Sequence, residues 1–439
     1  MAGNLTIRQA RLVLPERVVV GDLLVEDGVI ADIGPHILRT AGEEIDGTGL
    51  TVLPGVIDPQ VHFREPNAGN LCETLASGSR AAAAGGVTAF LDMPNNNPAC
   101  TTVEQLNQKL ASAAENSVIH YGFFIGATAD NAEEIAKADA ACGVSVSMSG
   151  STRDLRISER EHLEDIIANA NKVVAVHAED EARLNERKQQ YDGTTDVRDH
   201  PRIRDAESAL RATKLAVELA IKHGRRLHIL NLTSAEEVEF LGQIARDNIT
   251  TEVCPQHLFM DADTHYTSIG TLAQCDPPVR TKRHADALWR GLVDGTINCI
   301  ATDHEPHPLE EKQQSYPDSP SGMPNVEWSL PLLLNQHNQG RCTLQQIATW
   351  TSTSPAETYG IPRKGRLEVG FDADLVLCDL QQHRTITHAS TRSGCHWSPW
   401  DGVALQGWPV MTVVMGTPVF RDGHIIEGVR GRPLTFRRN

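Results

Sequence analysis

Histidine, carboxylate and amide side chains recur in short segments that each follow an apolar run. His62 stands in DPQVHFREP, His177 in VAVHAEDE and Asp303 in CIATDHEPH. Imidazole and carboxylate groups can bind a metal ion or transfer a proton. A single histidine beside a strand is more often structural than functional. Several such segments in register predict one shared site, provided that the fold brings them together.

The apolar runs that precede these segments alternate with helical stretches. The runs include VTAFLDM, HYGFFIGA, KVVAVHA, RLHILNL, ITTEVC and INCIATD, and the helical stretches include TVEQLNQKLASAAEN and ESALRATKLAVELAIKHG. Repeated β–α units predict a parallel sheet. About eight units in about 310 residues favour a closed barrel over an open sheet. In a barrel the carboxyl ends of the strands meet at one rim, where the polar segments would converge.

The two ends of the chain have a different pattern. Residues 4–53 alternate apolar and polar residues and contain Asp-Gly pairs, and the far end does the same in RLEVGFDADLVLCDL and VMTVVMGTPVFRDGHII. Asp-Gly between alternating runs is typical of β-hairpins. We therefore predict an α/β protein: a (β/α)8 TIM-type barrel over residues 55–365, with a small β-sandwich built from residues 1–54 and 366–439.

The composition is that of a globular protein with an acidic surface. The chain has 439 residues, 40% of them hydrophobic and 22% charged, and a formal net charge of −17. This charge argues against nucleic acids and anionic membranes as partners. No apolar run approaches the roughly 20 residues that cross a bilayer, and the N-terminus lacks a signal-peptide pattern. The nine cysteines have no metal-binding spacing, so we expect free thiols and a cytoplasmic protein.

Motifs along nearly the whole chain resemble those of the dihydroorotases and their relatives, the hydantoinases and allantoinases. The combination of HFREP, MPNNNP and ATDHEPH is specific to this group, and VAVHAEDE, EVCPQHLF and DADLVLCDL also fit. The resemblance implies an amidohydrolase barrel that reversibly opens a cyclic amide. For a dihydroorotase this reaction interconverts dihydroorotate and N-carbamoyl-aspartate in pyrimidine biosynthesis. The resemblance also implies a homodimer.

A metal centre is part of what this resemblance implies. The family holds two divalent ions, usually zinc, which generate hydroxide from bound water. His62 and His177 match two of the metal-binding histidines. Asp303 matches both a metal ligand and the catalytic residue that carries the water proton to the leaving nitrogen.

Three of the expected metal ligands are replaced. Gln60 takes the first position of the histidine pair after the first barrel strand, Ser145 that of a bridging lysine, and Asn231 that of a later histidine. A serine hydroxyl cannot be carbamylated and is a poor bridging ligand. His228 precedes Asn231 by three residues, which places it on the opposite face of a strand, so we do not expect it to substitute. We predict a partly degenerate site that holds one zinc ion, a weakly bound ion, or none.

By the same resemblance, the residues that bind the substrate carboxylate are retained. They are Arg64 in HFREP, Asn95 in MPNNNP and His307 in DHEPH. A guanidinium group matches a carboxylate with two parallel hydrogen bonds. Two simpler interpretations stay open: Arg64 pairs with Glu65 or another acid at the rim, and Asn95 only forms a turn.

Three functions are compatible with these residues. The first is a dihydroorotase-like hydrolase of a small cyclic acid, with Asp303 as the catalytic residue. The second is a non-catalytic homologue that serves as a structural partner, for example of aspartate transcarbamoylase. The third is a mononuclear hydrolase of another cyclic imide. Ser145 and Asn231 favour the second, whereas His62, His177 and Asp303 favour the first. The fold by itself cannot decide, because activity depends on the site.

Overall fold

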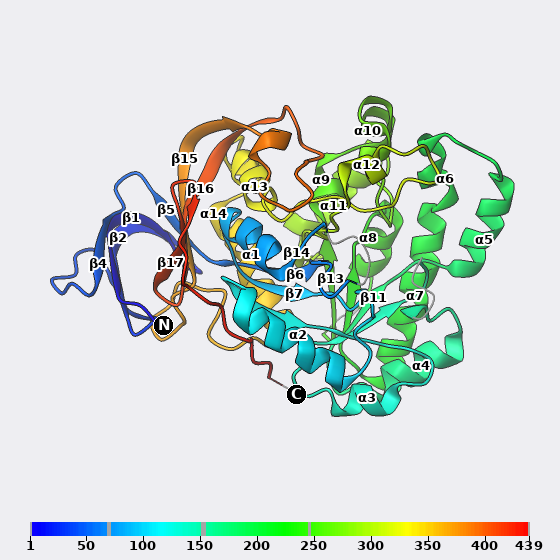
Figure 1. Ribbon diagram of the computed structural model, residues 1–439, viewed down its shortest axis with the longest axis horizontal. Coiled ribbons are helices and arrows are strands. Elements are labelled where there is room, and N and C mark those ends of the chain that lie inside the picture. The colour runs from blue at the N-terminus through cyan, green and yellow to red at the C-terminus, as the bar shows by residue number, and fades with distance from the viewer. Residues whose placement is uncertain (1, 68–71, 151–154, 245–246, 438–439) are drawn as a thin grey trace.

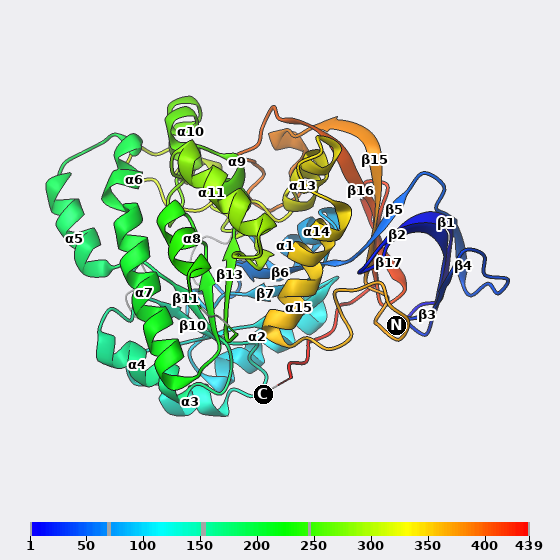
Figure 2. The same cartoon turned by 180° about the vertical axis from the view of Figure 1, so that it is seen from behind.

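The computed structural model describes residues 2–67, 72–150, 155–244 and 247–437. A ring of strands surrounded by helices forms the larger part of the molecule, and a β-layer made from both chain ends lies beside it (Figure 1). The view from behind shows the same two parts (Figure 2). Among the described residues, no helix has both the length and the apolar character needed to span a bilayer.

The ring is a barrel of parallel strands. Its strands are β6 (Val56–Val61), β7 (Val87–Asp92), β8 (His120–Phe123), β9 (Ile125–Gly126), β10 (Val144–Ser147), β11 (Val174–His177), β12 (Leu227–Leu230), β13 (Ile249–Val253) and β14 (Cys299–Ile300). They pair in chain order, β6 to β8 in one sheet and β9 to β14 in another. Only Phe124 separates β8 from β9, so these two segments count as one of eight barrel strands. A parallel bridge between Val61 and His304 joins the first strand to the segment after the last. The predicted (β/α)8 barrel is therefore confirmed.

Helices cover the outside of the barrel (Figure 2). The longest, α7 (Ala206–His223), is capped by Asp205, which accepts a hydrogen bond from the Ser208 N–H, and ends at Gly224 with a φ of 62°. Its buried alanines Ala212 and Ala216 allow close packing against the outward-facing residues of β11 and β12. The other α-helices are α1 (Leu75–Ala84), α2 (Val103–Asn116), α3 (Ala132–Lys137), α4 (Arg160–Asn169), α5 (Glu181–Gln190), α6 (His200–Ile203), α8 (Ala235–Gly242), α9 (Pro255–Phe259), α10 (Ala262–Ser268), α11 (Lys282–Val293), α12 (Leu309–Lys312), α13 (Ser329–Asn338), α14 (Leu344–Ala348) and α15 (Ser354–Tyr359).

The two ends of the chain form one nine-stranded sheet. Its strands are β1 (Leu5–Val13), β2 (Val18–Glu26), β3 (Val29–Gly34), β4 (Glu43–Asp46), β5 (Thr51–Pro54), β15 (Leu375–Thr385), β16 (Ala404–Val414), β17 (Thr417–Arg421) and β18 (His424–Ile425). β5 pairs antiparallel with β15, so that Val52 lies opposite Leu377. Between β2 and β3, Asp27 and Gly28 both have positive φ, 51° and 76°, as a tight Asp-Gly hairpin requires. The predicted small β-sandwich built from both chain ends is confirmed, and the two ends share one sheet.

A C-terminal segment, residues 386–403, leaves this sheet and packs against the barrel. Glu73, just before α1, accepts a hydrogen bond from the Gly394 N–H at 3.1 Å and another from the Ser393 hydroxyl. Trp397 Nε1 donates to the carbonyl of His307 at 2.8 Å. The segment therefore supports the loop that carries His307.

A buried ion pair fixes the loop that carries His62 and Arg64. Lys109 on α2 and Asp92 at the end of β7 are almost completely buried, and their charged groups are in contact. Asp92 also accepts a hydrogen bond from the Phe63 N–H at 2.8 Å. One carboxylate therefore anchors both the helix and the loop.

Lys109→Met should lower the free energy of unfolding by about 3–5 kcal/mol, because it leaves the Asp92 charge buried and unpaired. Urea denaturation measures this loss. Lys137→Met is the matched control, because Lys137 pairs with Glu133 at the surface and its loss should cost less than about 1 kcal/mol. Equal losses in the two variants would contradict the anchoring role of the Lys109–Asp92 pair.

Candidate active site

A cavity of about 880 Å³ opens at the carboxyl ends of the barrel strands. Every residue that the sequence predicted for the site lies in its wall, although their chemical roles stay predictions. These residues are Gln60, His62, Arg64, Asn95, Ser145, His177, Asn231, Asp303 and His307. The barrel therefore brings the polar segments together, as their positions after successive strands predicted.

The carboxylate of Asp303 is the centre of this cavity's hydrogen bonding. Gln60 Nε2 donates to Oδ1 at 3.0 Å, and His62 Nε2 contacts the same oxygen at 3.2 Å. Asn231 Nδ2 donates to Oδ2 at 2.9 Å. All three donors stand at positions where the family resemblance implies a metal ligand. Asp303 is thus held by protein N–H groups.

Burial and hydrogen bonding shift the pKa values of Asp303 and His62. Burial raises the pKa of Asp303, although the hydrogen bond from His62 works in the opposite direction. Burial disfavours the charged imidazole of His62, yet the contact with Asp303 and the charge of Glu305 raise its pKa above the ordinary value. His62 Nδ1 lies 2.6 Å from Asn95 Oδ1, so both ring nitrogens face oxygen atoms. This arrangement favours the doubly protonated ring.

The cavity wall also carries a second charged network. His177 Nε2 contacts Glu179 Oε2 at 2.9 Å, and Arg204 pairs with Glu179 and, at 3.0 Å, with Asp276. His200 Nε2 lies 3.0 Å from Asp276 Oδ1. Although burial opposes it, Arg204 and His177 hold the pKa of Glu179 at about 2. His177 is therefore engaged with this network.

Sequence reasoning did not single out Arg204 or His200, although both line the cavity. They come from the charged stretch DVRDHPRIRDAE, which contains α6 and the first residues of α7 and follows no strand. A search restricted to strand ends therefore misses them. One signal in the sequence could have identified them. Charged residues are dense in this stretch, and its apolar residues lack the spacing of a surface helix.

The two-metal centre does not fit these residues. Gln60 and Asn231 point amide hydrogens at Asp303, and Ser145 supplies only a neutral hydroxyl. Among the described residues, His62, His177 and Asp303 do not form a group whose ligand atoms all lie within 4.8 Å of one another. A zinc site needs about three converging ligands. The donor set therefore favours hydrogen bonding over a pair of divalent ions.

Two amide oxygens in this cavity have no hydrogen-bond partner among the described residues. They are Gln60 Oε1 and Asn231 Oδ1, both buried. A buried acceptor without a partner costs free energy that a bound donor recovers. Two residues that line the cavity beside Asp303 therefore keep an amide oxygen that no described group satisfies.

The residues predicted to bind a carboxylate, Arg64, Asn95 and His307, all make contacts with other protein groups. Arg64 Nη2 donates to His307 Nε2 at 2.9 Å and to Glu305 Oε1 at 3.1 Å. The interpretation that Arg64 pairs with an acid at the rim is thus borne out by the geometry, with Glu305 as that acid. Burial and the neighbouring Arg64 lower the pKa of His307 to about 3, so it is neutral at neutral pH. Asn95 contacts His62.

The expected orientation of His228 was wrong. Leu230 lines the cavity, and His228, two residues earlier on β12, therefore faces the barrel interior. Asn231 also faces inward, because it follows the end of β12 with a φ of 51°, which breaks the alternation on which the argument depended. His228 remains outside the cavity wall, in the layer beneath it.

Comparison with known proteins agrees with this architecture. A family model described as "Amidohydrolase family" matches residues 51–419. A dihydroorotase of Halobacterium salinarum is 36% identical over 433 residues, covering 93% of this chain and 99% of that protein. An L-hydantoinase of Paenarthrobacter aurescens is 31% identical and covers 99% of this chain and 98% of its own length.

Solved structures give the same result. The L-hydantoinase from Arthrobacter aurescens matches with a TM-score of 0.91 at 30% identity, covering 97% of this chain and 98% of that one. The dihydropyrimidinase from Brevibacillus agri matches with a TM-score of 0.91 at 26% identity, covering 99% and 100%. The chain therefore belongs to the amidohydrolase family and groups with its dihydroorotases and hydantoinases.

Proposed function

We propose that the protein is a dihydroorotase-like hydrolase of cyclic amides whose substrate is a small ring that carries a carboxylate. The observation that carries the proposal is a single cavity in which Asp303, two unpartnered amide oxygens and Arg64 occur together. The relatives at 30–36% identity that are named dihydroorotase support it.

The hydrogen-bonding groups of the cavity complement such a ring. A cyclic amide or ureide has N–H donors, for which Gln60 Oε1 and Asn231 Oδ1 are available acceptors. A ring carboxylate would pair with Arg64, whose guanidinium lies beside the neutral His307. Glu305 already contacts Arg64, so the substrate carboxylate must compete with it for the guanidinium. This competition favours modest affinity.

Ring opening requires two proton movements. Water adds to the ring carbonyl carbon, the bond from that carbon to the ring nitrogen breaks, and the water loses a proton while the nitrogen gains one. We assign both transfers to Asp303, because it lies in the cavity wall and burial raises its pKa toward that of an acid–base group. His62 and the two amides hold its carboxylate in place.

The likeness to dihydroorotases extends the proposal to the setting of the reaction. We propose that the protein acts in pyrimidine biosynthesis, in the cytoplasm, as a homodimer. The donor set of the cavity favours at most one weakly bound divalent ion there, with zinc as the ion that the family most often uses.

A second candidate is a non-catalytic homologue that keeps the barrel for assembly, for example with aspartate transcarbamoylase. The observation that favours it is the replacement of metal ligands by Ser145 and by the amides of Gln60 and Asn231, which bond to Asp303. Binding of the cyclic acid without turnover would characterise this candidate.

Arg64→Met should weaken dihydroorotate binding by about 10–100-fold, because a charge-assisted hydrogen bond contributes about 1.5–3 kcal/mol. Isothermal titration calorimetry measures this change, and circular dichroism checks the fold. Arg366→Met is the matched control, since Arg366 pairs with Glu357 and is not part of the cavity wall. Equal affinity in Arg64→Met and wild type would refute the anion pocket.

An activity assay distinguishes the two candidate functions. Formation of N-carbamoyl-aspartate by wild type, and its loss in Asp303→Asn, would support the hydrolase. Binding of dihydroorotate without turnover in wild type would support the second candidate.

Ser145→Lys combined with Asn231→His should raise the number of zinc ions bound per chain, because the pair restores a carbamylatable bridge and a histidine ligand. Metal analysis after equilibration with zinc measures the change. Ser147→Lys with Asn231→His is the control, since Ser147 lines the same cavity from β10. A rise of the same size in the control would contradict a bridging role for position 145.

A further inference from the structure

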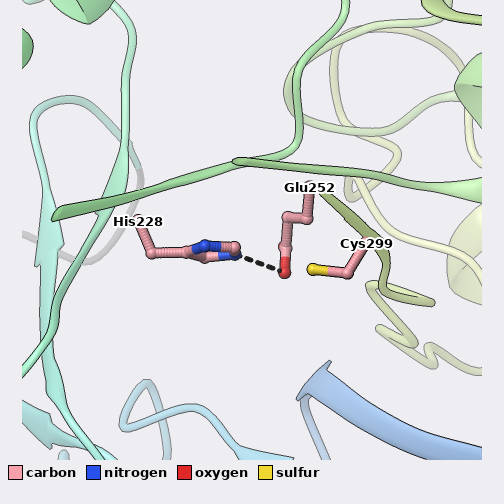
Figure 3. A group of neighbouring side chains, drawn as sticks. All are labelled: His228, Glu252 and Cys299. Atoms are coloured by element: carbon pink, nitrogen blue, oxygen red, sulfur yellow. Dashed lines mark hydrogen bonds and ion pairs between the residues drawn. The ribbon is translucent and has the colours of Figure 1, made fainter. Parts of the chain in front are cut away.

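Three potential metal ligands meet inside the barrel, in the layer beneath the cavity. They are His228 on β12, Glu252 on β13 and Cys299 on β14, and they point toward one another from adjacent strands (Figure 3). Their ligand atoms all lie within 4.8 Å of one another, and all three residues are completely buried. His228 Nε2 lies 3.0 Å from Glu252 Oε2.

The hydrogen bonds around His228 direct a lone pair at Glu252. Thr250 Oγ1 donates to the carbonyl of Leu227 at 3.4 Å, so this hydroxyl accepts from His228 Nδ1 at 2.8 Å. With its proton on Nδ1, the ring presents an unprotonated Nε2 to the Glu252 carboxylate. An outer hydroxyl that fixes the tautomer in this way is typical of metal-binding histidines.

The second oxygen of Glu252 is also unsatisfied. Oε1 has no hydrogen-bond partner among the described residues, although Glu252 is completely buried. A buried carboxylate without sufficient donors requires a cation or a proton. A metal ion would supply the positive partner for both the Nε2 lone pair and the unpartnered Oε1.

We propose that His228, Glu252 and Cys299 bind one divalent transition-metal ion of the zinc type, as a site separate from the cavity above. Nitrogen, oxygen and sulfur ligands together suit zinc. Tetrahedral zinc with bonds of about 2.0–2.1 Å places its nitrogen and oxygen ligands about 3.3 Å apart, close to the 3.0 Å observed between Nε2 and Oε2.

Charge and access also favour a structural ion. A thiolate and a carboxylate neutralise a divalent ion, so the completed group adds no net charge to the interior. The edge of the Tyr359 ring packs against the His228 ring, with centroids 5.6 Å apart, and the site has no exposed ligand. The ion would therefore enter during folding and resist chelators afterwards.

Metal analysis of the full-length protein tests the site. Protein purified without added metal should contain about one zinc ion per chain that survives dialysis against EDTA. Cys299→Ser and Glu252→Gln should each lose this ion. Cys378→Ser is the matched control, because Cys378 is equally buried but belongs to β15, and it should retain the ion.

Two further measurements keep the outcome decisive if a variant fails to fold. Wild type grown with cobalt should show a thiolate-to-cobalt charge-transfer band, which requires a cysteine ligand. His62→Ala should keep the EDTA-resistant ion, since His62 belongs to the upper cavity. Any one of three results would overturn the proposal. These are absence of the cobalt band in metal-loaded wild type, full zinc content in Cys299→Ser, and loss of the ion in His62→Ala.

Discussion

The hydrogen bonding of one buried carboxylate determines how the rest of the cavity is organised. Asp303 receives N–H groups from Gln60, His62 and Asn231. A buried carboxylate must be compensated, and in a metal centre the cations do so. Here amide and imidazole hydrogens compensate the charge, and the amide oxygens of Gln60 and Asn231 have no hydrogen-bond partner among the described residues. The residues at two expected metal-ligand positions thus also carry acceptors that no described group satisfies.

Acidic groups continue below this carboxylate into the barrel. Asp58 accepts from the Thr302 N–H at 3.0 Å, and burial, with a contribution from the charge of Glu252, raises its pKa to about 7. Glu252 lies one layer further down, with the charge of Asp303 acting on it. Stacked carboxylates of this kind cannot all ionise without cations. An interior rich in acids explains how a protein could lose metal affinity at the mouth and still favour a cation beneath it.

The sequence carried enough information for the architecture and for the location of the site. Alternating apolar runs and helices predicted the barrel, and Asp-Gly pairs such as Asp27-Gly28 predicted the hairpins of the shared sheet. Polar residues after successive strands had to meet, because parallel strands end at one rim. Family resemblance added which of them to compare with known ligands.

Contacts between side chains from distant segments could not be predicted from the sequence. The pairing of Arg64 with Glu305 depends on loop geometry that no periodicity encodes. Side chains alternate between the two faces within a strand, but the positive φ of Asn231 breaks this alternation just past the end of β12. The expectation that His228 and Asn231 lie on opposite faces failed for this reason. His228, Glu252 and Cys299 became neighbours only through the register of three adjacent strands.

The central claim is that protein hydrogen bonds replace metal ions around Asp303. Anomalous diffraction at the zinc edge, from crystals grown with zinc and dihydroorotate, tests it most directly. The account predicts at most one weak anomalous peak among His62, His177 and Asp303, and retention of the Gln60 and Asn231 contacts to the carboxylate. Two peaks bridged at that position, with both amides turned away from Asp303, would contradict it.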